Sequence, residues 1–202
     1  MTAARRASRR ALDRRTAVAT LLAVRRDALL VTGLGAPTWD AASVGDHPNN
    51  FYLWGAMGGA ALVGLGLAIA QPARRVLVLT GDGEMLMGLG GLATIGAQAP
   101  KNLAIVVVDN ECYGETGGQA SHTGRGVDLA GVAAAANFPS AVTIRTDREL
   151  HDWVPRCYRD TGPLLAVLKV AAAAASMVLP PRDGTYLKLR FREQLLGGGV
   201  HR

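Results

Sequence analysis

The chain has 202 residues, which is room for one domain with a sizeable core and too little for a large multidomain enzyme. Hydrophobic residues make up 49% of it and charged residues 19%, the latter below the roughly 25% of an average soluble domain. This composition excludes a disordered chain and indicates that some apolar surface serves to bind partners.

The net charge of +6 is unevenly distributed. Residues 1–26 contain eight arginines and one acidic residue, and the rest of the chain contains 14 basic and 15 acidic residues. The basic stretch could contact phosphates, and its richness in arginine and poverty in acids are also typical of a transit peptide. The simpler interpretation is the solvated face of a leading helix, which predicts no nucleic-acid partner. The arginines of that face would be Arg5, Arg6, Arg9, Arg10, Arg14 and Arg15.

The cysteine content and the hydropathy of the chain indicate the cellular compartment in which the protein is found. Cys112 and Cys157 have neither metal-site spacing nor a disulfide framework, which is typical of a reducing compartment and predicts a cytoplasmic protein. The longest apolar run, Leu164 to Leu179, is shorter than the roughly 20 residues that cross a bilayer. We therefore expect no membrane span.

The first half of the chain predicts an alternation of helices and strands. Apolar residues recur at helical spacing from Ala11 to Val24, and Ala28–Thr32 is a short run suited to a strand. Glycine and proline then predict a loop that continues to Asn50. Small apolar residues on nearly every side predict a buried helix over Gly55–Ala70, and strand Arg75–Thr80 follows.

The second half continues this alternation. The expected elements are helix Met85–Gln98, strand Leu103–Val108, a glycine-rich loop Asn110–Gly126, helix Leu129–Ala136, strand Ala141–Arg145, helix Arg148–Arg159 and strand Leu164–Val170. The pattern predicts an α/β fold, with helices on both faces of a parallel sheet. We expect a basic arm over 1–12, one α/β domain over 13–179 and a C-terminal extension over 180–202, an appended arm with a frayed end at Gly197–Gly199.

Polar residues follow two of the predicted strands directly. Gly81-Asp82-Gly83-Glu84 comes after VLVLT, and Asp109-Asn110 comes after LAIVVV. Ligands bind at the carboxyl ends of strands in open parallel sheets, so we expect Asp82 and Asn110 to stand at neighbouring strand ends. A carboxylate and an amide oxygen suit Mg²⁺, which prefers oxygen ligands and often shares them with a substrate phosphate.

The local backbone suits a phosphate as well. The glycines on either side of Asp82 allow a phosphate to approach the backbone closely. The helix expected to begin near Met85 directs its N-terminal amides to the same place. The sequence therefore predicts a joint site for Mg²⁺ and a phosphate group.

These residues resemble the cofactor motif of thiamine-diphosphate enzymes, in which GDG is followed after about 27 residues by Asn. The resemblance implies that Asp82, the Asn110 side chain and the backbone carbonyl of Cys112 are the Mg²⁺ ligands. The usual Asn-Asn pair of the family is here Asp109-Asn110, with the ligating second position retained.

Two further segments strengthen the resemblance. Asn50-Phe51-Tyr52-Leu53-Trp54-Gly55-Ala56-Met57-Gly58 is similar to the segment that carries a bulky apolar residue under the cofactor, and Met57 occupies that place. Tyr113-Gly114-Glu115-Thr116-Gly117-Gly118-Gln119, together with Gly90-Gly91-Leu92-Ala93-Thr94-Ile95, most resembles sulfopyruvate decarboxylase β subunits and phosphonopyruvate decarboxylases. The likeness extends from about Asp13 to Val170.

The resemblance implies a set of site residues. Those expected to bind the cofactor, thiamine diphosphate, are Gly55, Met57, Gly81, Asp82, Gly83, Glu84, Asn110, Cys112, Tyr113 and Gly114. Those that would either shape the loop or touch the cofactor or substrate are Glu115, Thr116 and Gln119. Arg125 is the best candidate in the chain for a cation that meets a second anionic group of the substrate, although a solvated arginine is the simpler interpretation.

The resemblance also implies what the chain lacks. Thiamine catalysis needs an activating glutamate that the family carries on a pyrimidine-binding domain, and no stretch of this sequence resembles that domain. We therefore expect no complete catalytic set in this chain and a partner α subunit that supplies the glutamate, in an α2β2 or larger assembly. The implied reaction is the decarboxylation of a small anionic 2-oxo acid such as sulfopyruvate or phosphonopyruvate, giving CO₂ and an aldehyde.

Other functions stay open at this point. Within the same cofactor class, the chain could belong to a carboligase or to an oxoacid oxidoreductase. Outside catalysis, it could be a thiamine-diphosphate-binding or sensor subunit.

Overall fold

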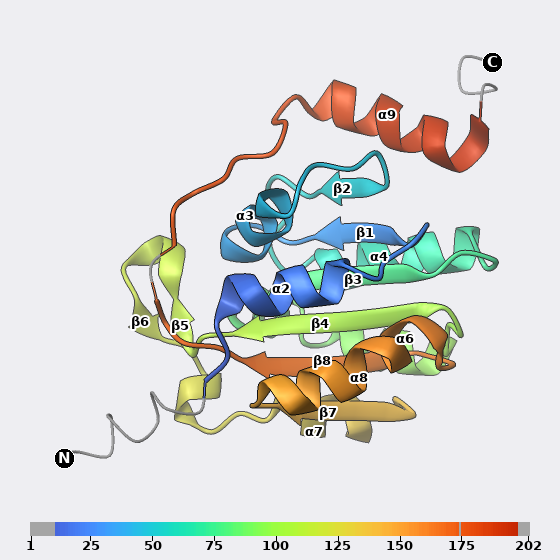
Figure 1. Ribbon diagram of the computed structural model, residues 1–202. Coiled ribbons are helices and arrows are strands. Elements are labelled where there is room, and N and C mark those ends of the chain that lie inside the picture. The colour runs from blue at the N-terminus through green and yellow to red at the C-terminus, as the bar shows by residue number, and fades with distance from the viewer. Residues whose placement is uncertain (1–10, 174, 198–202) are drawn as a thin grey trace.

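The structure is a computed structural model that describes residues 11–173 and 175–197. Six strands of this part of the chain form a sheet in the order β2-β1-β3-β4-β8-β7 (Figure 1). The strands are β1 (Leu29–Thr32), β2 (Asn50–Tyr52), β3 (Val76–Gly81), β4 (Leu103–Asp109), β7 (Ser140–Ile144) and β8 (Leu164–Lys169). All neighbouring strands are parallel, which confirms the predicted α/β class.

Helices cover both faces of the sheet (Figure 1). One hydrophobic cluster includes residues of α2 (Arg14–Leu22), α3 (Ala36–Ser43) and α8 (Asp147–Arg159). The other includes residues of α4 (Ala60–Ala70), α5 (Asp82–Met87), α6 (Gly91–Gln98) and α7 (Leu129–Ala135). Successive strand residues alternate between these two clusters, as Leu77 and Val78 do. Burial on both faces explains why the central strands are apolar throughout.

Local capping residues fix where two of the helices begin. Asp13 accepts a hydrogen bond from the backbone N–H of Thr16 and so caps α2. At α8, Thr146 and Glu149 form a reciprocal capping box. Such caps satisfy amide groups that the first helical turn leaves without an intrahelical partner.

The predicted loop between β1 and Asn50 is wrong in part, because it contains α3 and leads into β2. Pro37 lies in the first turn of α3, where proline costs no hydrogen bond. The predicted helix over Gly55–Ala70 starts too early, since α4 begins at Ala60. Gly55, Ala56 and Gly58 all have positive φ angles, of 92°, 50° and 88°, which a right-handed helix excludes.

The single helix predicted over Met85–Gln98 is also wrong. The structure has two helices there, α5 and α6, and they are separated at residues 88–90. Gly88 lies directly against Gly58, and a Cβ atom on Gly88 would sit 2.1 Å from the carbonyl oxygen of Gly58. The break therefore lets two loops of the sheet's carboxyl edge touch.

The basic N-terminal stretch can be described only from residue 11. The predicted arm over 1–12, with Arg5, Arg6, Arg9 and Arg10, lies largely outside the described residues. The prediction of a solvated face is wrong for Arg14 and Arg15, because both form ion pairs with the fully buried Asp40 of α3. A buried carboxylate requires a partner of opposite charge, and this requirement holds both arginines against the fold.

The C-terminal extension contains a helix, α9 (Gly184–Leu196), which lies next to β2 (Figure 1). Leu187 and Phe191 are buried, and the Phe191 ring lies 5.3 Å from that of Phe51 in β2. The predicted arm therefore packs on the sheet, and of its predicted frayed end only Gly197 is described. No helix in the described part of the chain has the length and hydropathy of a membrane span.

Candidate functional site

The carboxyl edge of the sheet brings the polar strand ends together. β3 and β4 are neighbours, and Gly81 pairs with Val108 in their register. Asp82 and Asn110 follow these two strands, which confirms that they stand at neighbouring strand ends. α5 begins at Asp82 itself, with Gly81 as its N-cap, so its first turn starts three residues earlier than predicted.

A cavity of about 530 Å³ opens at this edge. It collects most of the residues that the sequence singles out: Met57, Gly81, Asp82, Gly83, Glu84, Asn110, Cys112, Tyr113, Gly114, Glu115 and Thr116. Gly55 and Gln119 do not line it. Residues that are far apart in the sequence thus converge on one space of the size usual for a ligand pocket.

Asp82 is the central carboxylate of the cavity. Its side chain is buried, and its Oδ2 accepts hydrogen bonds from the hydroxyls of Ser121 (2.5 Å) and Thr123 (3.2 Å). Burial raises the pKa of this carboxyl, and the nearby charge of Asp109 acts in the same direction. In the described chain no Lys, Arg or His side chain pairs with Asp82. A cation bound at Asp82 would relieve the cost of its burial.

Asp109 and Asn110 differ in their surroundings. Asp109 is buried and pairs with Lys169 at 2.8 Å. Asn110 lines the cavity, and its Oδ1 accepts a hydrogen bond from the backbone N–H of Cys112 at 3.0 Å. Lys169 thus neutralises the carboxylate in the first position of the pair, while the amide in the second position faces the cavity.

The donor set fits Mg²⁺ better than a transition metal. Among the described residues there is no group of three or more His, Cys, Asp or Glu side chains that could hold a metal ion. The lining residues Asp82, Asn110 and Cys112 instead carry a carboxylate, an amide oxygen and backbone carbonyls. Mg²⁺ commonly takes one or two carboxylates and fills its other positions with water and phosphate oxygens.

The loop predicted over Asn110–Gly126 folds over the turn at Asp82. It contains a small hairpin of β5 (Cys112–Tyr113) and β6 (Gln119–Ala120), with the 3-10 turns η1 (Gly114–Thr116) and η2 (Thr123–Arg125). The Tyr113 ring lies so close to Gly83 that a Cβ atom there would be 2.8 Å from it. The Tyr113 hydroxyl shares a 3.0 Å hydrogen bond with Nδ1 of His122. A side chain at residue 83 would therefore displace an aromatic wall of the cavity.

Glu84 connects three segments beneath the cavity. It is buried, and Thr80 donates a 2.8 Å hydrogen bond to its Oε2. A Cβ atom on Gly33 would lie 1.5 Å from the same oxygen. Burial raises the pKa of Glu84, while hydrogen bonds from Thr80 and from backbone amides, including that of Gly58, oppose this. Glu84 thus ties the loop after β1 to the start of α4.

The cavity also includes residues that the sequence analysis did not select. From the loop after β1 and from α3 come Leu34, Gly35, Ala36, Pro37 and Trp39, and from other segments come Arg14, Val108, Gly118, Ala172, Ala173 and Ala175. The loop after β1 could have been found by the rule already used, because it too lies at the carboxyl end of a strand. Arg14 could not, since only the tertiary fold brings it there. Arg125, the predicted cation, lies in η2 and does not line this cavity.

Comparisons with known proteins identify the family. Residues 34–168 match the family model of the thiamine pyrophosphate enzyme C-terminal TPP binding domain. The fold is similar to that of a thiamine diphosphate-dependent 4-hydroxybenzoylformate decarboxylase from Rhodococcus jostii, with a TM-score of 0.68 and 17% identity. That match covers 82% of this chain and 34% of the other.

Two curated relatives are more similar in sequence. The sulfopyruvate decarboxylase subunit beta of Methanothermobacter thermautotrophicus is 38% identical over 186 residues, which are 92% of this chain and 97% of the relative. A phosphonopyruvate decarboxylase of Streptomyces viridochromogenes is 41% identical over 145 residues, and the match spans 72% of this chain but 36% of that longer protein. The family model alone covers more than half of the residues, and so the chain belongs to the thiamine pyrophosphate enzymes and carries their C-terminal TPP binding domain.

Proposed function

We propose that the chain is the diphosphate- and Mg²⁺-binding subunit of a two-subunit, thiamine-diphosphate-dependent decarboxylase. The substrate would be a small anionic 2-oxo acid such as sulfopyruvate or phosphonopyruvate. Its decarboxylation would give CO₂ and an aldehyde. The observation that carries this proposal is the buried Asp82 carboxylate, which forms no ion pair with any described residue, in a cavity shared with Asn110. The names of the two curated relatives support the reaction and the substrate class.

Different residues of the cavity would bind Mg²⁺, the diphosphate and the rings of the cofactor. Asp82, Asn110 and the carbonyl of Cys112 would hold Mg²⁺, and the ion would supply positive charge that offsets the charge of the diphosphate. The N-terminal turn of α5, which begins at Asp82, would offer backbone amides to the diphosphate. Met57 lines the cavity and is 43% exposed, so it offers an apolar contact to the cofactor rings. The bound cofactor supplies the electron sink that the loss of CO₂ requires.

The loop after Cys112 would form the substrate side of the cavity. Glu115 and Thr116 line it. Gln119 holds the loop from outside, because its Nε2 donates to the carbonyl of Thr116 at 2.8 Å and its Oε1 accepts from the Thr116 hydroxyl at 3.2 Å. Arg14 brings positive charge to the rim of the cavity, although it also pairs with Asp40.

The activating glutamate would come from a partner subunit. Glu149 belongs to the capping box of α8, Glu193 is exposed on α9, and neither lines the cavity. A curated relative whose length this chain nearly spans is named subunit beta, which supports a partner α subunit. We propose an α2β2 or larger assembly. The two free cysteines agree with a reducing compartment, and we propose a cytoplasmic location.

The metal assignment can be tested by removing only the charge of Asp82. Asp82→Asn should abolish Mg²⁺-dependent binding of thiamine diphosphate in the assembled complex, and Asn110→Ala should weaken it, while circular dichroism and thermal unfolding stay close to wild type. Asp128→Ala is the matched control, because Asp128 is an exposed carboxylate of the same edge loops and does not line the cavity. Undiminished cofactor binding in both site variants would refute the assignment.

The two-subunit proposal needs its own experiment. A tagged copy purified from its native host should bring down, in stoichiometric amount, a second chain that mass spectrometry identifies as a pyrimidine-binding subunit. The complex should then release CO₂ from sulfopyruvate or phosphonopyruvate, and the isolated chain should not. A chain that elutes alone as a homo-oligomer would contradict the split enzyme and favour a cofactor-binding or sensing role.

A further inference from the structure

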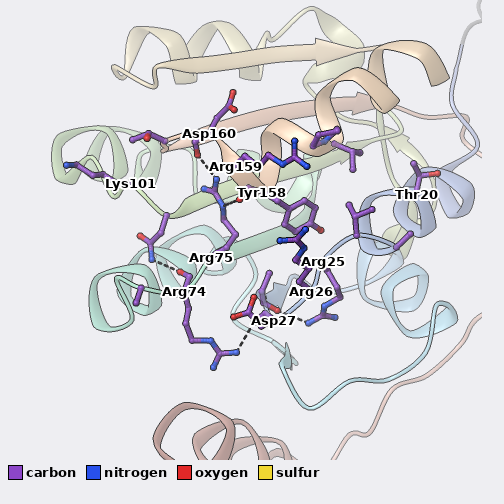
Figure 2. Close-up of a pocket in the computed structure, with 18 of the residues that line it drawn as sticks. Thr20, Arg25, Arg26, Asp27, Arg74, Arg75, Lys101, Tyr158, Arg159 and Asp160 are labelled. Carbon is purple, nitrogen blue, oxygen red and sulfur yellow. Dashed lines mark hydrogen bonds between the residues drawn. The ribbon is translucent and has the colours of Figure 1, made fainter.

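A second cavity lies at the opposite edge of the sheet. It has a volume of about 1130 Å³, and it is lined by residues that lie just before β1, β3 and β4 and by Asp160 and Thr161, a few residues before β8 (Figure 2). Because all these strands are parallel, their amino ends share one edge of the sheet, away from the site that contains Asp82. The remaining wall is formed by α2 and α8, through residues such as Thr20 and Val154. Its volume suffices for a nucleotide-sized ligand.

Positive charge dominates this amino-edge cavity. Six cationic side chains line it, namely Arg25, Arg26, Arg74, Arg75, Lys101 and Arg159, against the carboxylates of Asp27 and Asp160. Within the described residues, none of the six takes part in an ion pair. Asp160 instead pairs at 2.9 Å with Arg156, which does not line the cavity. The local field therefore favours an anion.

Backbone carbonyls, which are uncharged, hold several of these guanidinium groups in place. Arg75 donates to the carbonyl oxygens of Tyr158 (3.4 Å) and Asp160 (2.5 Å). Arg25 donates to the carbonyl of Ala28 at 3.0 Å, and Arg74 to that of Asp27 at 2.8 Å. Figure 2 shows Arg75 and Arg74 fixed in this way from the segment before β3. The side chains are thus positioned in advance, and their charge is left uncompensated.

Two guanidinium nitrogens of the cavity residues have no hydrogen-bond partner within residues 11–173 and 175–197. They are Nε of Arg25 and Nη1 of Arg75, and both are buried. Burial lowers the pKa of both guanidinium groups, because it disfavours the charged form. A buried cation without a counter-charge is costly, and an anion in the cavity would lower that cost.

We propose that this amino-edge cavity binds a small molecule with two or more phosphate groups, at a site separate from the proposed cofactor site. Arginine recognises phosphate through two parallel N–H donors. The cations come from four separate segments of the chain, so a ligand with several charged groups engages more of them than a single carboxylate could. This site does not depend on the proposed decarboxylase function.

Binding is measured by isothermal titration of the full chain with tripolyphosphate and, separately, with ATP. Mg²⁺ is removed with EDTA, so that Mg²⁺-dependent diphosphate binding at Asp82 does not contribute. We expect saturable binding of tripolyphosphate that sulfate at equal ionic strength does not reproduce. Much tighter binding of ATP would identify a nucleotide as the ligand class, and equal binding would identify the phosphate chain itself. Tripolyphosphate that binds no better than sulfate overturns the proposal.

Variants locate the site. Arg26 and Arg159 are exposed and make no side-chain hydrogen bond in the described chain, so Arg26→Ala and Arg159→Ala should leave the fold intact. Each should weaken tripolyphosphate binding roughly tenfold, as expected for the loss of one charged hydrogen bond. Arg148→Ala is the control, because Arg148 is an exposed arginine of α8 outside the cavity. Unchanged binding in both cavity variants, or loss of binding in Asp82→Asn, would place the anion elsewhere.

Discussion

Asp109 and Lys169 form a mostly buried ion pair at the carboxyl ends of β4 and β8, with their side chains 2% and 14% exposed. Removing only one partner of such a pair leaves an uncompensated charge. Lys169→Met should therefore lower the free energy of unfolding by about 3–5 kcal/mol, measured by urea denaturation.

The double variant Asp109→Asn/Lys169→Met provides the control for that experiment. It removes both charges of this pair and leaves Glu111, the second partner of Lys169 at 2.5 Å, whose side chain is 49% exposed to water. The amide that replaces the Asp109 carboxylate still offers an oxygen to the Thr123 hydroxyl, which donates to Asp109 at 2.8 Å in the wild type. Most of the lost stability should return. A double variant as unstable as Lys169→Met alone would show that Lys169 acts by packing and not by charge.

The two cysteines should differ in reactivity. Cys157 is fully buried, and burial raises the pKa of its thiol to about 12, whereas Cys112 is partly exposed beside the cofactor cavity. Since the thiolate is the reactive form, a thiol reagent at pH 8 should modify Cys112 and leave Cys157 untouched until the chain unfolds. Rapid modification of two thiols in the native protein would contradict this.

The raised pKa of Cys157 also affects stability at high pH. Above the pKa of the unfolded thiol, the unfolded chain loses a proton that the folded chain keeps, so the free energy of unfolding falls as the pH rises from about 9 toward 12. Cys157→Ala should reduce that fall, which is measured by urea denaturation at a series of pH values. An equally steep fall in the variant would assign it to other groups.

At the scale of elements, α4 shows how a small residue sets the distance between a helix and the sheet. A Cβ atom on Gly64 would lie 2.2 Å from Cγ2 of Val78 in β3, whereas one on Gly66 would have no neighbour within 4 Å. Gly64→Ala should therefore destabilise the protein by about 1–3 kcal/mol through overpacking.

Gly66→Ala is the matched control on the same helix. It should stabilise the protein by about 0.5–1 kcal/mol, because alanine loses less backbone entropy in a helix than glycine does. Thermal unfolding of both variants measures the contrast. Equal effects of the two substitutions would mean that α4 can shift away from β3 without cost.

The elements that the sequence predicted well are those whose signal is local. Strands β3 and β4 are continuous apolar runs that stop at polar residues, so both their positions and the closeness of Asp82 and Asn110 followed from pattern and topology. The missed elements depend on tertiary contacts. The break between α5 and α6 exists because Gly88 touches Gly58, and α3 begins at a Gly-Ala-Pro segment that also suits a loop. Arg14 and Trp39 reach the cavity only through the fold.

At the scale of the whole molecule, the apolar surface expected from the composition includes side chains of α4 and α5. Leu62 and Val63 on α4 and Met87 on α5 are 43%, 38% and 64% exposed. A Cβ atom on Gly58 would lie 3.2 Å from that of Met87, and Gly58 follows Met57, which lines the cofactor cavity. Met87 is therefore an exposed apolar residue close to the cofactor cavity, where a partner subunit that shares the cofactor would contact it.

Met87→Glu should weaken association with the partner roughly tenfold or more, because a charge would be buried in an apolar interface. The thermal stability of the isolated chain should not change, since Met87 is mostly exposed there. Leu196→Glu on α9 is the control, because Leu196 is similarly exposed, at 57%, and lies on a helix that does not border the cavity. Co-sedimentation measures the association. If Met87→Glu binds the partner as tightly as the wild type does, the interface does not include Met87.

The position of α9 affects how the protein avoids self-association. β2 is an outer strand of the sheet, and an open strand edge is a template on which other chains can add strands and grow into aggregates. Arg190 of α9 donates to the carbonyl oxygen of Asn50 in β2 and pairs with Asp46 just before it. A side chain thus occupies an acceptor that a foreign strand would need. By covering this acceptor, α9 should hinder the addition of strands from other chains to β2 and so reduce aggregation at that edge.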